Sequence, residues 1–149
     1  MYSHILISTD GSELAQRGLD HGLSLAKALG AKVTIITVTE PIPFPAGAAG
    51  AGWVPTVTDI ASYEKAQKEQ AEQLLGKVRE QIEKLDLKGN FIHAPDSWPA
   101  EAILQAAKTH NCNLIVMASH GRRGLGRLIL GSQTSEVLAG SPVPVLVVK

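Results

Sequence analysis

Cysteine is almost missing from this sequence, because Cys112 is the only one among 149 residues. A single cysteine excludes an internal disulfide, and it excludes zinc and redox sites of the CxxC type. This usage suits a reducing compartment, so we expect a cytosolic protein.

An excess of charge of one sign is missing as well. The 14 lysine and arginine residues balance the 14 aspartate and glutamate residues, so the formal net charge is zero. The chain therefore has no overall field with which to hold a nucleic-acid backbone or an anionic lipid surface. We expect neither nucleic acid nor a membrane as a partner.

Long hydrophobic runs are also lacking. Residues 1–10 have no basic segment followed by a long apolar stretch, so we do not expect a secretory signal. The longest uncharged stretch, residues 41–58, carries four prolines and three glycines, which are incompatible with a membrane-spanning helix. We expect one domain over residues 1–149 with a long flexible loop at about 41–58, and loops of this length are usually functional or mobile.

Short apolar, β-branched runs alternate with longer stretches of helical period. This alternation is typical of an α/β domain with a mainly parallel sheet. The predicted strands are residues 4–8, 32–38, 90–93, 114–119 and 143–148.

Four helices are expected between and after these strands. The first is capped by Ser12 and stopped by Gly30, and the second covers about residues 59–85. The third starts at Ser97 as its cap, has a proline in its first turn and continues to about residue 110. The fourth follows Gly131 and ends near Gly140.

A doubly wound sheet binds its ligand outside the carboxyl ends of the strands, where the winding reverses. The chemistry is therefore expected just after Ser8, Val38 and Ser119. After the fourth strand, a glycine-bearing loop leads into a helix whose first peptide N–H groups have no partner within the helix.

Such a helix end attracts phosphate. Gly131 would let a ligand approach the backbone closely, and the hydroxyls of Ser132 and Thr134 could add hydrogen bonds to phosphate oxygens. The same segment also fits a plain turn with a serine cap. The segment does not match either of two standard nucleotide-binding motifs. The P-loop motif GxxxxGK[ST] does not occur, and in the Rossmann motif GxGxxG the position of the third glycine is occupied by Ile129.

The segment resembles the signature of the universal stress protein family. The nucleotide-binding branch of that family carries G-x-x-G, nine residues, and then G-[ST]. Here Gly121 is the second glycine, residues 122–130 are the spacer, Gly131-Ser132 closes the motif, and Ala118 replaces the first glycine. The resemblance covers essentially the whole chain, including residues 5–12, 99–103, 114–121 and 142–148.

The resemblance implies a fold and a ligand. The fold would be a single doubly wound α/β domain like the adenine nucleotide alpha hydrolases, with a five-stranded parallel sheet in the order 3-2-1-4-5 and four helices. The ligand would be ATP or AMP, with Asp10 as the residue that would help to place a Mg²⁺ ion. The implied nucleotide-binding residues are Ser8, Thr9, Asp10, Val38, Met117, Ala118, His120, Gly121, Gly131, Ser132, Gln133 and Thr134.

Their implied roles divide by position. Residues 8–10 would contact the adenosine or metal side, Val38 would lie against adenine, and Met117 with Ala118 would line the base and ribose. The remaining residues, from His120 onward, would surround the phosphates. The methyl of Ala118 matters, because it would either face the ribose or pack away from it.

Some of these residues have simpler interpretations. Asp10 also fits a turn or capping residue, and His120 fits a loop histidine held by backbone bonds. The basic cluster would embrace phosphate or form solvated or intersubunit pairs; it consists of Arg122, Arg123 and Arg127. The other histidines have no metal-ligand spacing, so we interpret them as structural.

The function predicted from these features is that of a cytosolic universal stress protein that binds ATP or AMP and acts in stress response or signalling. One alternative is a family member that has lost its nucleotide and acts through dimer or partner contacts, and another is a slow ATP hydrolase. No residue is assigned a catalytic role. The SGGxDS loop of the ATP pyrophosphatases is absent at residues 8–13, and Ser119 and His120 lack the nucleophile elbow of a hydrolase.

A homodimer is expected through the last strand, which the order 3-2-1-4-5 places at the edge of the sheet. An apolar, unprotected edge invites pairing with another chain, and Pro142 and Pro144 would protect only its start. A two-fold axis would pair the strand with its copy, the interface residues being Val143, Val145, Leu146 and Val147. The alternative is that a loop or the terminus covers this edge within one chain.

Overall fold

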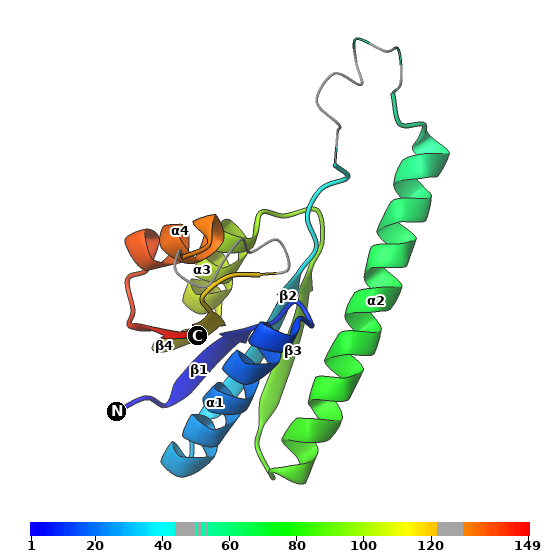
Figure 1. Ribbon diagram of the computed structural model, residues 1–149. Helices are drawn as coiled ribbons and strands as arrows, with labels where there is room; N and C mark the ends of the chain where they lie inside the picture. The colour runs from blue at the N-terminus through cyan, green and yellow to red at the C-terminus, as the bar shows by residue number, and fades with distance from the viewer. Residues whose placement is uncertain (44–49, 51, 53, 122–129) are drawn as a thin grey trace.

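The computed structural model describes residues 1–43, 50, 52, 54–121 and 130–149. Strands and helices alternate along the chain (Figure 1), as the hydrophobic pattern predicts. Their order is β1 (His4–Ser8), α1 (Glu13–Leu29), β2 (Lys32–Val38), α2 (Val57–Lys84), β3 (Gly89–Ala94), α3 (Pro99–Thr109), β4 (Leu114–Ala118), α4 (Ser132–Gly140) and β5 (Val145–Val148).

The sheet has five parallel strands in the order β3-β2-β1-β4-β5, so the predicted topology is confirmed. The chain winds outward from β1 through β2 to β3, then returns to the other side of β1 to form β4 and β5. The winding therefore reverses between β1 and β4, and the carboxyl ends of these two strands form the switch point of the fold.

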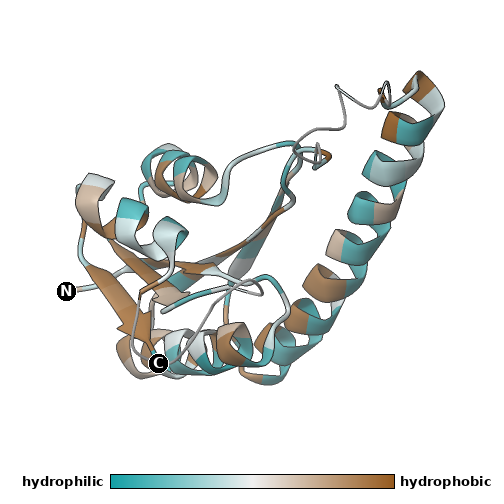
Figure 2. Cartoon of the chain, turned by 45° about the horizontal axis from the view of Figure 1, so that its top comes forward, coloured by the Kyte–Doolittle hydropathy of each residue, from teal (hydrophilic) through white to brown (hydrophobic). Residues whose placement is uncertain are grey.

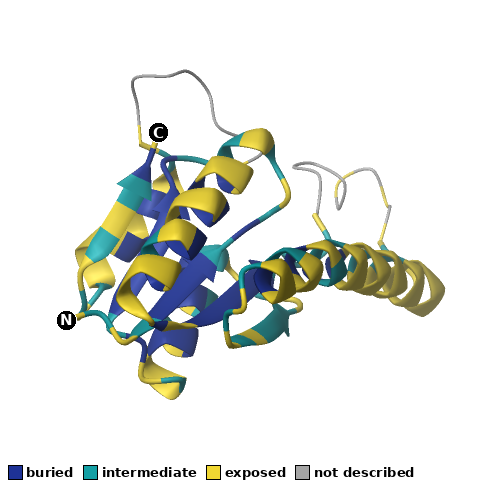
Figure 3. Ribbon diagram, turned by 90° about the horizontal axis from the view of Figure 1, so that it is seen from below, coloured by how far each residue is buried: buried dark blue, intermediate teal, exposed yellow. Residues whose placement is uncertain are grey.

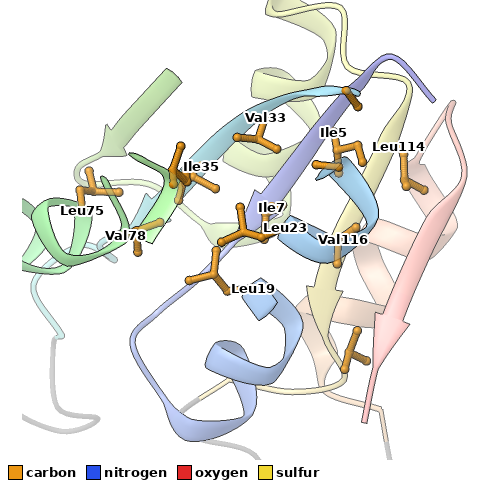
Figure 4. Packing of buried hydrophobic residues seen from close by; sticks show 14 residues of the cluster. Ile5, Ile7, Leu19, Leu23, Val33, Ile35, Leu75, Val78, Leu114 and Val116 are labelled. Carbon is orange, nitrogen blue, oxygen red and sulfur yellow. The ribbon is translucent and has the colours of Figure 1, made fainter. Parts of the chain in front are cut away.

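Each face of the sheet carries its own hydrophobic core, because side chains alternate along a strand. Ile5 and Ile7 of β1 pack against α1 and α2, whereas Leu6 between them packs against α3 and α4. Figure 4 shows Leu19 of α1 among the residues that gather on the first face. The strands of this sheet are accordingly strongly apolar (Figure 2), as expected for a parallel sheet covered on both faces.

Local signals set the ends of the first two helices. The Ser12 side chain accepts a hydrogen bond from the N–H of Ala15, and Gly30 ends α1 with φ +64°, both as predicted. Helix α2 begins two residues earlier than predicted, because Thr56 and Asp59 form a reciprocal capping box. The Thr56 N–H donates to the carboxylate of Asp59 and thereby lowers its pKa.

The predicted cap of α3 is wrong. Trp98, not Ser97, occupies the N-cap position, and the Ser97 hydroxyl donates instead to the carbonyl of Pro95 at 2.8 Å. The N–H of Ala100 is satisfied from another helix, since it donates to Oε1 of Gln133 at 2.9 Å.

The boundaries of three strands also differ from the prediction. Strand β3 is longer by one residue at each end, and β4 ends one residue earlier, at Ala118. Strand β5 begins at Val145 rather than at residue 143. Before it, the Ser141 hydroxyl bonds both the N–H and the carbonyl of Val143, so this stretch forms a local turn.

Helix α2 reaches beyond the sheet, and its outer part is exposed along most of its length (Figure 3). Its buried residues all lie in the second half, namely Ala71, Leu75, Val78 and Ile82. In the first half, the hydroxyl of Tyr63 donates to the carbonyl of Glu40 at 3.1 Å and ties the helix to the end of β2. Among the described residues, no helix combines the length and apolar character needed to cross a membrane.

Candidate functional site

A cavity of about 890 Å³ opens at the carboxyl ends of the strands, over the switch point between β1 and β4. Its volume lies within the usual range of small-molecule sites. The structure brings all twelve predicted site residues to its wall: Ser8, Thr9, Asp10, Val38, Met117, Ala118, His120, Gly121, Gly131, Ser132, Gln133 and Thr134. The predicted contacts Arg122, Arg123 and Arg127 lie outside the described residues.

The N-terminus of α4 forms one end of this cavity. Gly131 is the N-cap, and its N–H donates to the carbonyl of Ser119 at 2.9 Å, which joins the two ends of the connecting loop. The first bond within the helix runs from Ser135 to Gly131, so the N–H groups of residues 132–134 have no partner inside the helix. These donors and the helix dipole together favour an anion.

Two side chains of this helix end are already engaged. The Thr134 hydroxyl donates to the carbonyl of Ala118 at 3.1 Å, and the residue is only 2% exposed. Its proton therefore holds α4 to β4 and is not available to a phosphate, contrary to the role expected for this hydroxyl. The Gln133 side chain caps α3, so Ser132 carries the hydroxyl that can still serve a ligand.

Close packing explains the glycine at position 131. A Cβ atom there would lie 3.1 Å from Cβ and 3.2 Å from Cα of His120, which is tighter than ordinary contact. The His120 ring lies beside the same loop end, with Nδ1 3.3 Å from Oγ of Ser119. The glycine is thus required by the close approach of the two loop ends, since its φ of −61° is open to any residue.

Asp10 forms a turn and also borders the cavity. Its Oδ1 accepts a hydrogen bond from the N–H of Ser12 at 2.9 Å, so it forms the turn between β1 and α1. Its Oδ2 lies against the second motif glycine, since a Cβ atom on Gly121 would approach it to 2.9 Å. The carboxylate therefore lies at the junction of the β1 turn and the loop that follows β4.

The alanine that replaces the first motif glycine lies on the α1 side of the sheet. Strand alternation places Ala118 on the same face as Val116, which belongs to the core under α1, while Met117 faces α3. Helix α1 approaches β4 closely at this point, since a Cβ atom on Gly18 would lie 3.4 Å from the backbone N of Ala118. The methyl thus lies on the opposite face from Met117.

The α3 side of the cavity is mostly apolar. Val38 and Met117 line it as predicted, and Ile36 and Ile103 extend the apolar surface. Trp98 also lines the cavity and is 57% exposed. Sequence reasoning missed Trp98, although an aromatic residue just after the third strand and before a helix-starting proline is a readable signal.

Helix α2 supplies the opposite wall, which sequence reasoning did not include. Most of its lining residues recur at spacings of four and three, so one face of the helix borders the cavity: Tyr63, Gln67, Gln70, Ala71, Gln73, Leu74 and Lys77. Most of this face is polar. Only the tertiary position of α2 could reveal it, because the same pattern also describes a solvated helix face.

Two half-buried histidines have structural partners. Nε2 of His93 lies 2.8 Å from the hydroxyl of Thr39, and Nε2 of His4 lies 2.8 Å from the hydroxyl of Thr34. Burial is the main cause that lowers the pKa of both imidazoles. Burial likewise raises the pKa of the Cys112 thiol, which packs in the α3 core. Over residues 1–43, 50, 52, 54–121 and 130–149, no three His, Cys, Asp or Glu residues cluster as metal ligands would.

Comparisons with known proteins agree with this arrangement. A universal stress protein of Thermus aquaticus is 37% identical over 153 residues, with both chains covered completely. A universal stress protein of Methanocaldococcus jannaschii is 33% identical over 151 residues, covering 100% of this chain and 83% of the relative.

Solved structures show the same fold. The structure of a second Methanocaldococcus jannaschii protein superposes with a TM-score of 0.79 at 27% identity, covering 100% of this chain and 96% of that one. Two more distant universal stress proteins, both 20% identical, were solved in complex with cAMP (TM-score 0.67) and, from Archaeoglobus fulgidus, with dAMP (TM-score 0.65). The model of the universal stress protein family matches residues 1–149, and the chain belongs to that family.

Proposed function

We propose that this protein binds an adenine nucleotide, ATP or AMP, in the cavity at the carboxyl ends of the strands. One observation carries the proposal: the cavity joins a helix N-terminus, whose first N–H groups have no partner within the helix, to an apolar wall between β2, β4 and α3. A nucleotide has the same two halves, a charged phosphate end and a flat, mostly apolar base. Universal stress proteins of the same fold in complex with cAMP and dAMP support this choice of ligand.

The phosphates belong at the α4 end. The peptide N–H groups of residues 132–134 and the Ser132 hydroxyl supply donors there, and the close packing of Gly131 keeps side-chain atoms away from them. His120 lines the same end and can donate from its ring.

The base belongs between β2 and β4. Val38 and Met117 come from the carboxyl ends of these strands and supply apolar contacts. The methyl of Ala118 lies on the other face of β4, so the departure from the family motif leaves the base side open.

The carboxylate of Asp10 is suited to bind the Mg²⁺ ion of a magnesium nucleotide. A carboxylate beside phosphate oxygens repels them unless a cation lies between, and carboxylate and phosphate oxygens are the ligands that Mg²⁺ prefers. Asp10 would hold such an ion from the protein side, and the phosphates would supply further oxygens. The ion would neutralise charge and orient the phosphates.

We expect adenine nucleotide to accompany the purified protein or to bind on addition. Mass spectrometry of the small molecules released by denaturation identifies a resident nucleotide, and calorimetry with ATP, ADP and AMP in the presence of Mg²⁺ measures affinity. A protein that releases no nucleotide, gives no binding heat and gains no thermal stability with any of the three would contradict the proposal. It would then favour a family member that acts through its contacts alone.

We also propose that the protein is cytosolic and acts in stress response or signalling as a homodimer formed by β5. Strand β5 lies at the sheet edge. The backbone N–H and C=O groups of its even-numbered residues point toward β4, because the N–H of Ile115 donates to the carbonyl of Pro144 and the N–H of Ser119 to that of Val148. Val145 and Val147 therefore direct their N–H and C=O groups outward.

Pro144 does not blunt this outer edge. Its carbonyl faces β4, and the N–H that proline lacks would point to the same side. The strand also exposes an apolar side chain, since Leu146 is 37% exposed. Antiparallel pairing with a second copy would satisfy the outward groups and close the assembly.

Replacing Val147 by lysine is expected to convert the dimer to a monomer, because two-fold pairing would bring the added charge close to its copy. Light scattering at micromolar concentration measures the mass. Val54→Lys is a matched control, since Val54 is 67% exposed and lies far from β5 along the chain. A wild-type monomer, or a dimer that persists in Val147→Lys, would contradict the proposed dimer.

A further inference from the structure

An exposed tryptophan lines the cavity. Trp98 has 57% of its surface accessible, whereas Val38, Ile103 and Met117, which line the same cavity, are largely covered by the protein. Leaving a large aromatic side chain in water forgoes a substantial hydrophobic contribution. We propose that Trp98 is the stacking platform for the nucleobase, and this inference rests on the proposed nucleotide function.

The fold holds Trp98 in a defined place. It is the N-cap of α3, its carbonyl accepts a hydrogen bond from the N–H of Ala102 at 3.0 Å, and Pro99 follows it with a restricted φ. The Oε1 atom of Gln133 accepts from the N–H of Ala100 at 2.9 Å and thereby ties the start of α3 to the start of α4. The Trp98 backbone is therefore held relative to the helix end that would bind phosphate.

The second aromatic residue on the described wall is placed differently. Tyr63 lies on α2, and its hydroxyl donates to the carbonyl of Glu40, so it belongs to the polar wall. Trp98 instead comes from the start of α3, the helix that also brings Ile103 to the cavity, and Ile103 and Met117 belong to the apolar core on this side of the sheet. A base inserted on this side would have aliphatic contacts from the strands and an aromatic face from the start of α3.

Stacking on Trp98 predicts a preference among bases. The overlap of flat rings grows with ring area, so stacking contributes more binding free energy for a purine than for a pyrimidine. It contributes none for a sugar phosphate without a base. We therefore expect the affinity order AMP, then CMP, then ribose 5-phosphate. Loss of the indole should reduce the differences between these three ligands.

The test compares Trp98→Ala and Trp98→Phe with the wild type by calorimetry. Because base–aromatic stacking contributes about 1–3 kcal/mol per base, Trp98→Ala should weaken AMP binding by about 5- to 150-fold. Trp98→Phe should retain most of the affinity. Binding of ribose 5-phosphate should be the same in all three proteins, because no base is present to stack.

Fluorescence provides a measurement that does not depend on the folding of the alanine variant. Trp53 is the other tryptophan of the chain, so in Trp53→Phe the signal comes from Trp98 alone. We expect AMP to change this emission and ribose 5-phosphate to leave it unchanged. Unaltered AMP affinity in Trp98→Ala, or unaltered Trp98 emission with AMP bound, would overturn the inference while leaving nucleotide binding intact. Failure of the wild type to bind AMP and ATP would instead overturn the proposed function together with the inference.

Discussion

Replacing Gly131 by leucine is expected to weaken ATP and AMP binding at least about 100-fold, a loss of about 3 kcal/mol. A Cβ atom at this position already meets the backbone and Cβ of His120 at 3.1–3.2 Å, so the larger side chain must either displace His120 or turn into the cavity. Both outcomes disturb the donors at the start of α4, on which phosphate binding depends. Calorimetry with each nucleotide measures the loss.

Gly76→Leu is the matched control for this variant. Gly76 lies on α2, and a Cβ atom there meets nothing within 4 Å. We expect it to bind nucleotide like the wild type. Gly131→Leu should still unfold cooperatively, because the residue is only half-buried and belongs to neither core cluster. Retained affinity in a folded Gly131→Leu protein would show that the phosphates do not lie at this helix end.

Replacing Gly22 by valine is expected to lower the free energy of unfolding by about 3 kcal/mol, at the upper end of what overpacking a core costs. Gly22 lies where α1 crosses the sheet, and a Cβ atom there would be 2.6 Å from Cδ1 and 2.9 Å from Cγ1 of Ile7. Ile7 has no exposed surface, and a γ-methyl of Val116 would lie 3.4 Å from the same Cβ atom. The new side chain must therefore push α1 off the sheet or displace the centre of the core.

Urea denaturation followed by circular dichroism measures this change. Gly76→Val is the matched control, since it makes the same substitution in a helix interior with open space around it. It should leave stability unchanged or raise it by less than about 1 kcal/mol, because valine is a better helix former than glycine. Equal stabilities of the two variants would contradict the packing described for α1.

Much of the fold could be predicted because its signals are local. The period of apolar residues predicts the strands and the longer helices, and the caps at Ser12 and Gly30 act within one helical turn. The capping box of Thr56 and Asp59 was equally local and could have been found by its spacing. The strand order required the resemblance to the family, because a pattern of elements does not state which strands are neighbours.

The α3 cap shows where local reasoning failed. Ser97 is a good capping residue in isolation, but the acceptor for Ala100 comes from Gln133, which is 33 residues away in sequence. The Thr134 hydroxyl is a similar case, because its acceptor is the carbonyl of Ala118 across the loop. A side chain that satisfies a distant backbone group leaves no periodic trace in the sequence.

The sequence by itself determined the α/β class, the positions of the elements and the glycine-bearing loop before α4, since these depend on periodicity and on short motifs. Only the tertiary structure decided that a polar face of α2 and the indole of Trp98 border the cavity at the ends of β1, β2 and β4, and that Ala118 turns its methyl toward α1. The physical reason is that a short segment encodes its own conformation and hydrogen-bonding capacity. Which groups remain available to a ligand depends on the partners that the packed chain brings to them.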